Sequence, residues 1–153
     1  MPIRPSRSAV ALALFGAALL LGTSLARAAD LELEISGVTA TSADKPSTVQ
    51  VAAYASADVW LKKPTATARA ASTEARDGVL KVRLKGLPEG PVAIAICQDL
   101  NGNGKLDSSV IGIPVEPYAF SRQAQGNFGP PTFDQAVLPA GTTRHAIRLP
   151  AQP

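Results

Sequence analysis

The sequence predicts an all-β fold, a single antiparallel β-sandwich of about seven strands. Short segments after residue 28 alternate apolar and polar side chains, which is the period of a half-buried strand. Glycine and proline separate these segments at short intervals, as turns do between strands. No segment after residue 28 has a convincing helical period, because even the alanine-rich residues 66–75 lack an apolar stripe.

Each expected strand follows from its own pattern. Residues 31–36 and residues 80–85 alternate most clearly, so each has one buried face. Residues 92–97 are apolar on both faces, which is typical of a central strand. The expected strands are residues 31–36, 48–54, 65–71, 80–85, 92–97 and 143–149. The Gly-Leu-Pro-Glu-Gly-Pro turn at residues 86–91 predicts an antiparallel hairpin between its two flanking strands.

The first 28 residues have the layout of a secretory signal peptide. Arg4 and Arg7 precede an apolar run over residues 9–21, and Ala26-Arg27-Ala28 provides a small-x-small cleavage site. Cleavage after Ala28 would release one domain of residues 29–153 to the periplasm or the exterior. The alternative is an uncleaved anchor, but the run is shorter than the roughly 20 residues of a spanning helix. We therefore expect no transmembrane segment after cleavage.

Charge and cysteine content narrow the classes of partner. The full chain has fifteen basic and twelve acidic residues, a formal charge of +3. Three arginines leave with the leader, so the mature chain is formally neutral and no nucleic-acid partner is expected. Cys97 is the one cysteine, which excludes a disulfide within the chain. It ends an apolar run and is expected to be a small buried side chain, with pairing between chains or reactivity as the alternatives.

Residues 99–107 predict a weak calcium site. Oxygen-bearing side chains alternate around a glycine turn, and a hard cation takes such ligands. The expected ligands are Asp99, Asn101, Asn103, the backbone carbonyl of Lys105, and Asp107.

The match to known calcium loops is incomplete. Val110 stands where an EF-hand needs a bidentate glutamate, and Glu116 would have to fold back to replace it. The expected dissociation constant is therefore about 10⁻⁴–10⁻³ M, as in extracellular modules. The alternative is a metal-free turn, because asparagine and aspartate bond their own backbone and tolerate left-handed conformations.

An irregular region at about residues 108–134 follows this motif. Loops of this length are uncommon in compact domains and are often functional. We expect Tyr118 and Phe128 to be exposed as a partner surface, and Phe120 and Phe133 to be buried. The alternative is that the aromatic residues fold down and plug an open end of the sandwich.

No catalytic group is evident. A nucleophile triad needs a base, and His145 is the only histidine. It falls on the same strand face as Ile147 and Leu149, so we expect a rim or core histidine with a backbone partner. No catalytic residue and no zinc site are predicted, and Trp60 is expected in the core.

Four motifs carry a family resemblance: Gly86-Leu87-Pro88-x-Gly90, the residues 99–107 described above, Gly112-Ile113-Pro114-x-Glu116-x-Tyr118-x-Phe120-Ser121, and Gly126-x-Phe128-Gly129-Pro130-Pro131-x-Phe133. Together they resemble a bacterial secreted family known as domain of unknown function 2141. The resemblance implies one exported β-sandwich domain without an established activity. At lower specificity the first motif resembles transthyretin-like and carboxypeptidase-regulatory-like sandwiches, which allows a Greek-key or transthyretin-like topology. Cys97-Gln98 departs from the tyrosine or histidine typical of the family near this point.

These observations favour a non-enzymatic exported module that binds a protein, a glycan or an envelope component, or has a structural role. The alternative is an envelope enzyme with its site in residues 99–133.

Overall fold

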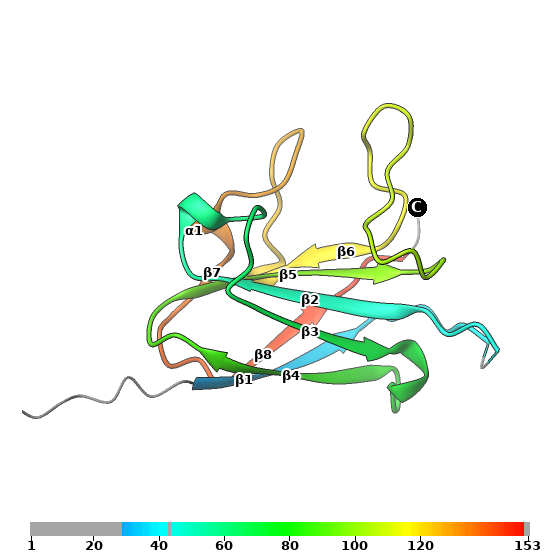
Figure 1. Cartoon of the computed structure of the whole chain (residues 1–153), viewed down its shortest axis with the longest axis horizontal. Helices are drawn as coiled ribbons and strands as arrows, with labels where there is room; N and C mark the ends of the chain where they lie inside the picture. Colours follow the sequence, from blue (N-terminus) through cyan, green and yellow to red (C-terminus); the bar gives the residue numbers. More distant parts are fainter. Residues whose placement is uncertain (1–28, 43, 152–153) are drawn as a thin grey trace, which may run out of the picture.

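The computed structural model describes residues 29–42 and 44–151, which form an all-β fold with little helix (Figure 1). The predicted leader lies outside the described residues. The strands are β1 (Ala29–Ser36), β2 (Thr48–Tyr54), β3 (Ala66–Ala71), β4 (Val79–Leu87), β5 (Val92–Asp99), β6 (Tyr118–Phe120), β7 (Val137–Leu138) and β8 (Arg144–Arg148). The helical turns are α1 (Phe133–Ala136), η1 (Ala57–Val59), η2 (Ser72–Glu74) and η3 (Ser121–Gln123). No helix in this part of the chain is both long and apolar enough to span a bilayer.

The strands form two sheets. One has the order β4-β1-β8, and the other has the order β3-β2-β5-β6, with β7 also paired to β5. The expectation of purely antiparallel sheets was wrong at one position, because β8 pairs with β1 in parallel. β1 is the middle strand of the three-stranded sheet, with β4 on one side. β8 occupies its other side and runs in the same direction as β1.

The predicted hairpin at residues 86–91 was also wrong. β4 pairs with β1 and β5 pairs with β2, so the turn carries the chain from one sheet to the other. The four residues between β4 and β5 reach about 13 Å, enough to cross the roughly 10 Å between packed sheets. The strand after the turn is apolar on both faces and therefore lies inside the larger sheet, as its pattern predicts.

A shared apolar core joins the two sheets. It includes Leu31, Leu33 and Ile35 from β1, Leu80, Val82 and Leu84 from β4, Val49 and Val51 from β2, and Ile94 and Ile96 from β5. These residues occupy alternate positions of their strands, so each sheet turns one apolar face inward. The outward side chains of the five-stranded sheet therefore do not contribute to this core.

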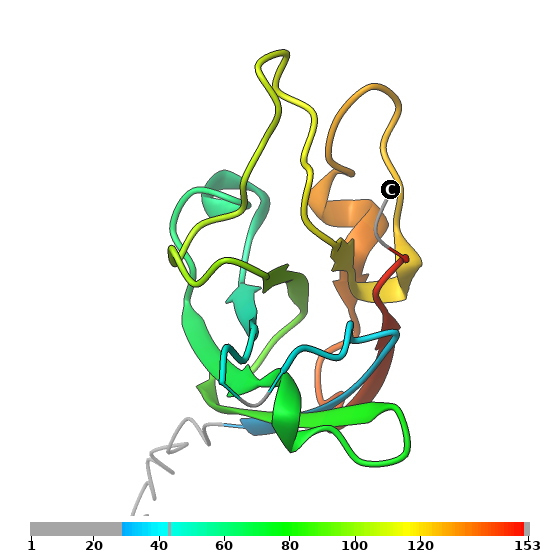
Figure 2. The same ribbon diagram turned by 90° about the vertical axis from the view of Figure 1, so that its right-hand side faces the viewer.

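Three connecting segments, residues 55–65, 100–117 and 121–136, project on the outer side of the five-stranded sheet (Figures 1 and 2). The region at 108–134 is therefore more ordered than expected, because it contains β6, η3 and the start of α1. These elements have only three or four residues each, too few to produce a recognisable period.

Candidate functional site

The outer face of the five-stranded sheet is the floor of a groove. The strand registers arrange its outward side chains in rows that cross from β3 to β6. One row consists of Arg69, Gln50, Cys97 and Tyr118. The neighbouring row consists of Thr67, Ala52, Ala95 and Phe120. The first row is polar and the second is mostly small and apolar, so the floor has a polar side and an apolar side.

The projecting segments form the walls of this groove. Leu61 and Pro64 come from residues 55–65, Leu106 and Pro114 come from residues 100–117, and Pro130 comes from the last segment. The groove has a volume of about 610 Å³, within the usual range for small-molecule sites in proteins. Its walls are apolar, so the polar groups that a ligand meets lie mainly on the floor.

A cluster of aromatic side chains, separate from the core between the sheets, closes one end of the groove. Trp60 packs against Tyr54, Phe120 and Phe133, with ring centroids 5.1, 5.7 and 6.1 Å away. The Trp60 Nε1–H donates a hydrogen bond to the carbonyl oxygen of Pro131 at 2.8 Å, which joins two of the walls. The cluster is distinct from the core between the sheets.

Phe120 and Phe133 are buried, as expected, at 8% and 9% exposure. They cover the outer face of the sheet rather than an open end of the two-sheet stack, and Trp60 joins them there instead of the main core. The small side chains of Ala93 and Ala95 leave room for the rings on this face.

Cys97 lies in the polar row, half-buried, and lines the groove. The side chain was expected to be buried and is only half-buried, because it lies on the outer face of β5, where the groove leaves it partly open. Burial raises the pKa of Cys97 to about 11, with Glu116 and Asp99 adding to the increase and Arg69 opposing it. The thiol is therefore protonated at neutral pH and is a poor nucleophile.

The predicted cation motif lies at the polar end of the groove, after β5. Asp99 is buried, and its carboxylate accepts hydrogen bonds from the backbone N–H groups of Gly102, Asn103 and Gly104 at 2.6–3.2 Å. The Gln50 amide adds a longer bond of 3.3 Å. This carboxylate therefore organises the whole turn from the inside.

The structure also brings together the other side chains predicted as ligands. The Asn103 amide nitrogen donates to both oxygens of Asp107 at 2.9 Å, and the Asn101 amide donates to the same carboxylate. Lys105 is exposed, and its backbone N–H donates to the Asn103 side-chain oxygen at 2.8 Å. Among the described residues, no group of three or more His, Cys, Asp or Glu side chains is arranged to hold a metal ion.

Glu116 folds back onto this turn. Its carboxylate accepts hydrogen bonds from the backbone N–H groups of Leu100 at 2.8 Å and Asp107 at 3.0 Å, and the side chain is buried. Glu116 therefore ties the two ends of the projecting segment together at its base.

Tyr118 and Phe128 are exposed, as expected. Tyr118 lies on β6 and lines the groove, with its ring 5.8 Å from that of Phe120. Phe128 lies outside the groove at the end of its loop. The two residues proposed as one partner surface therefore occupy different parts of the outer side, and whether either binds a partner stays a prediction.

His145 has the backbone partner that the sequence suggests. Its Nε2 accepts a hydrogen bond from the backbone N–H of Arg122 at 3.0 Å, and burial lowers its pKa. It lies on β8, in the sheet opposite Cys97.

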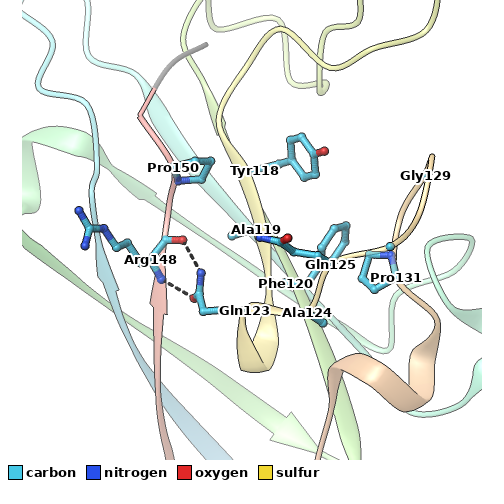
Figure 3. Close-up of a pocket in the computed structure, with 11 residues that line it drawn as sticks. Tyr118, Ala119, Phe120, Gln123, Ala124, Gln125, Gly129, Pro131, Arg148 and Pro150 are labelled. Atoms are coloured by element: carbon cyan, nitrogen blue, oxygen red, sulfur yellow. Dashed lines mark hydrogen bonds between the residues drawn. The ribbon is translucent and has the colours of Figure 1, made fainter.

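A smaller hollow of about 370 Å³ lies between β6, η3 and the end of β8 (Figure 3). The Gln123 amide donates to the Arg148 carbonyl at 3.0 Å and accepts from the Arg148 N–H at 2.7 Å, which joins η3 to the end of β8. Tyr118 lines both this hollow and the groove. Its side chain therefore stands between the two spaces.

The chain matches a family of known proteins. The model of a bacterial family described as "Uncharacterized protein conserved in bacteria (DUF2141)" matches residues 34–148, three quarters of the chain. The chain belongs to this family. No curated protein and no solved structure matches it. The segment that matches DUF2141 contains the groove, the projecting loops and every strand except the first five residues of β1.

Two buried polar residues of this DUF2141 domain were missed from the sequence. The Gln98 amide donates to the Thr39 carbonyl and the Ser47 hydroxyl at 2.8 and 2.7 Å. The Ser121 hydroxyl accepts from the Ile94 N–H at 2.9 Å and donates to the Ala136 carbonyl. A glutamine at the end of an apolar strand was the one signal for such a role, since buried polar groups need partners.

Proposed function

We propose that this protein is a non-enzymatic binding protein that holds a small amphipathic ligand in the groove on the outer face of the five-stranded sheet. One observation carries the proposal: a groove of about 610 Å³ with apolar walls and a polar row along one side. Ligand sites are typically apolar concavities with a few polar groups that fix orientation.

The two rows of the floor suggest how such a ligand would lie. Its apolar part would rest on Ala52 and Ala95, against the walls. Its polar group would face Arg69, Gln50 and Tyr118, which offer a guanidinium, an amide and a hydroxyl. Arg69 is exposed and forms no ion pair among the described residues, so its charge is available to an acceptor group.

The chemistry of the lining favours binding over the alternative of an envelope enzyme with its site in residues 99–133. Among the described residues, those that line the groove include no histidine and no carboxylate. Cys97 is the candidate nucleophile in the lining of the groove, and its raised pKa keeps the thiol protonated.

A fluorescent apolar probe tests this function. The neutral dye 1-N-phenylnaphthylamine should brighten on addition of the purified protein, and Ala95→Phe should abolish the increase because the ring fills the apolar row. The matched control is Ala146→Phe, which places the same ring on an exposed strand position of the other sheet. Thr67→Trp fills the groove from its exposed edge and serves if Ala95→Phe lowers the melting temperature.

The proposal fails if the wild-type protein does not bind the dye. It also fails if both folded filling variants bind as the wild type does, since the dye would then lie elsewhere.

We also propose that the domain acts outside the cytoplasm, in the periplasm or at the exterior, as a single β-sandwich that begins at Ala29. The leader pattern supports export, and the core shared by the two sheets supports the sandwich. A protein, a glycan or another envelope component would then be the source of the ligand or the partner.

As a second candidate, we propose weak calcium binding at residues 99–107. The observation in its favour is that Asn101, Asn103 and Asp107 converge on one another within the turn. With calcium bound, the two amides would turn their oxygens inward, at the expense of their present hydrogen bonds. This competition is consistent with an affinity in the extracellular range of about 10⁻⁴–10⁻³ M.

A further inference from the structure

Two loop tips on the outer side of the molecule carry exposed apolar side chains. Residues 108–114 form the first tip, and residues 125–130 form the second. Val110 is 104% exposed, Ile111 is 76% exposed and Phe128 is 111% exposed, and Ile113 is also exposed. Clusters of large, exposed apolar side chains usually mark a surface that contacts a protein, a ligand or a membrane.

Both tips have defined backbone structure that holds these side chains outward. In the first tip, the Ser109 N–H donates to the Ile113 carbonyl at 2.7 Å, and the Gly112 N–H donates to the Ser109 carbonyl at 2.9 Å. An isolated bridge between Ser108 and Pro114 closes its base.

The second tip closes tightly on itself. A Cβ atom at Gly126 would lie 2.4 Å from the Gly129 carbonyl oxygen, so only glycine fits there. Phe128 has a φ of 59°, an unfavourable backbone conformation for an aromatic residue. The tip therefore keeps its aromatic ring exposed, although the backbone conformation of Phe128 and the contact of its ring with water are both energetically unfavourable.

The charge pattern indicates the kind of surface that the tips meet. Neither tip contains a charged residue. Below them, the three projecting segments carry four exposed basic residues, Lys62, Lys63, Lys105 and Arg122, and two exposed acidic ones, Asp58 and Asp134. Their two other carboxylates, the half-buried Asp107 and the buried Glu116, accept hydrogen bonds within the turn at residues 99–107. Uncharged apolar ends above a collar whose exposed side chains are mildly basic match the order of a membrane surface, with acyl chains below anionic phosphates.

We propose that the two tips insert into the surface of a lipid bilayer that contains anionic phospholipid. Both tips project on the same side of the molecule in two perpendicular views, so one surface can receive them together (Figures 1 and 2). A fluid lipid layer admits two separate apolar points without matching pockets, whereas a protein partner would need a cavity for each.

Vesicle co-sedimentation tests the proposal. The purified protein should sediment with vesicles of phosphatidylcholine and phosphatidylglycerol in a three-to-one mixture. Phe128→Asn combined with Ile111→Ser should reduce the partition coefficient about tenfold or more, because two apolar side chains are lost. Asparagine tolerates a positive φ, so Phe128→Asn removes the ring without new backbone strain.

Three controls separate the causes. Phe128→Leu keeps an apolar tip and should bind within about threefold of the wild type. Ala95→Phe fills the groove, whose walls include Pro114 and Pro130 of the tips, but it leaves the exposed side chains of Ile111 and Phe128 in place. It should therefore still bind vesicles, whether or not the groove holds a ligand. Unchanged melting temperatures of the tip variants should accompany their loss of binding.

Three results would overturn the proposal: no sedimentation of the wild type, sedimentation that the tip variants do not change, or a tip-dependent dimer that forms without lipid. The last result would assign the tips to a second copy of the chain.

Discussion

Cys97 and Gln98 are neighbours on β5 with opposite environments, because successive side chains of a strand point to opposite faces. Gln98 faces the space between the sheets, where three hydrogen bonds satisfy its amide. Cys97 faces the groove in a row with Arg69 and Tyr118. One position along the strand therefore separates a structural role from a place in the site.

The raised pKa of Cys97 predicts a slow thiol in the folded protein. At pH 8 only about one thiol in a thousand is ionised when the pKa is about 11. Its reaction with a disulfide reagent should be slow at pH 8, and the rate should continue to rise above pH 10. In urea the rate should level off near the ordinary pKa of about 8.5.

The sign of the stability effect follows from the same shift. The unfolded thiol ionises first as the pH rises, so the free energy of unfolding should fall from about pH 8.5 towards 11, and Cys97→Ser should lack this component. A plateau in the rate of the folded protein below pH 9 would contradict this account.

At the scale of elements, pattern length decides what can be predicted from the sequence. Strands of five or more residues with regular alternation, such as β1 and β4, are recognised from the chain alone. β6 and β7 have three and two residues, and such short strands contain no period. Which strands pair also depends on which face of each strand has to be buried, and the sequence of a turn does not show this. The prediction of a hairpin at residues 86–91 was wrong for this reason.

The turn at residues 99–107 gives a prediction at this scale. Calcium at ten times its dissociation constant should stabilise the protein by about 1.4 kcal/mol and raise the melting temperature by a few degrees. Asp107→Asn should remove this increase and change the calcium-free melting temperature little, because Asp107 is only partly buried. Asp134→Asn is the matched control, since it removes an exposed carboxylate from α1, outside the turn.

Asp99→Ala should behave differently from Asp107→Asn. It should lower the free energy of unfolding by about 2–4 kcal/mol even without calcium, because it leaves three backbone N–H groups without their acceptor. No increase in the wild-type melting temperature at calcium concentrations of about 10 mM, well above the expected dissociation constant, would reject the metal site.

At the scale of the whole molecule, two apolar clusters lie on opposite faces of one sheet. The inner cluster joins the two sheets, and the outer cluster of Tyr54, Trp60, Phe120 and Phe133 anchors the projecting loops. The groove occupies the part of the outer face that this second cluster leaves uncovered. The aromatic burial was predictable, but the groove was not, because it depends on strand register and on where three distant loops meet.

The leader gives a prediction for the whole chain. Protein recovered from the native envelope should have the mass of residues 29–153, with removal of Ala29 as the next-best cleavage. The physical reason is the small-x-small sequence Ala26-Arg27-Ala28 after an apolar run, which signal peptidases accept. An intact mass that includes Met1 would overturn the proposed location.

The central claim, that the outer face of the five-stranded sheet binds an amphipathic ligand, is tested most directly by a nitrogen-15 NMR titration with 1-N-phenylnaphthylamine. The dye should shift the amide signals of Ala52, Thr67 and Ala95 on the floor, while those of β1 and β8 in the other sheet stay unchanged. No shifts up to the solubility limit of the dye, or shifts centred on the three-stranded sheet, would contradict the account.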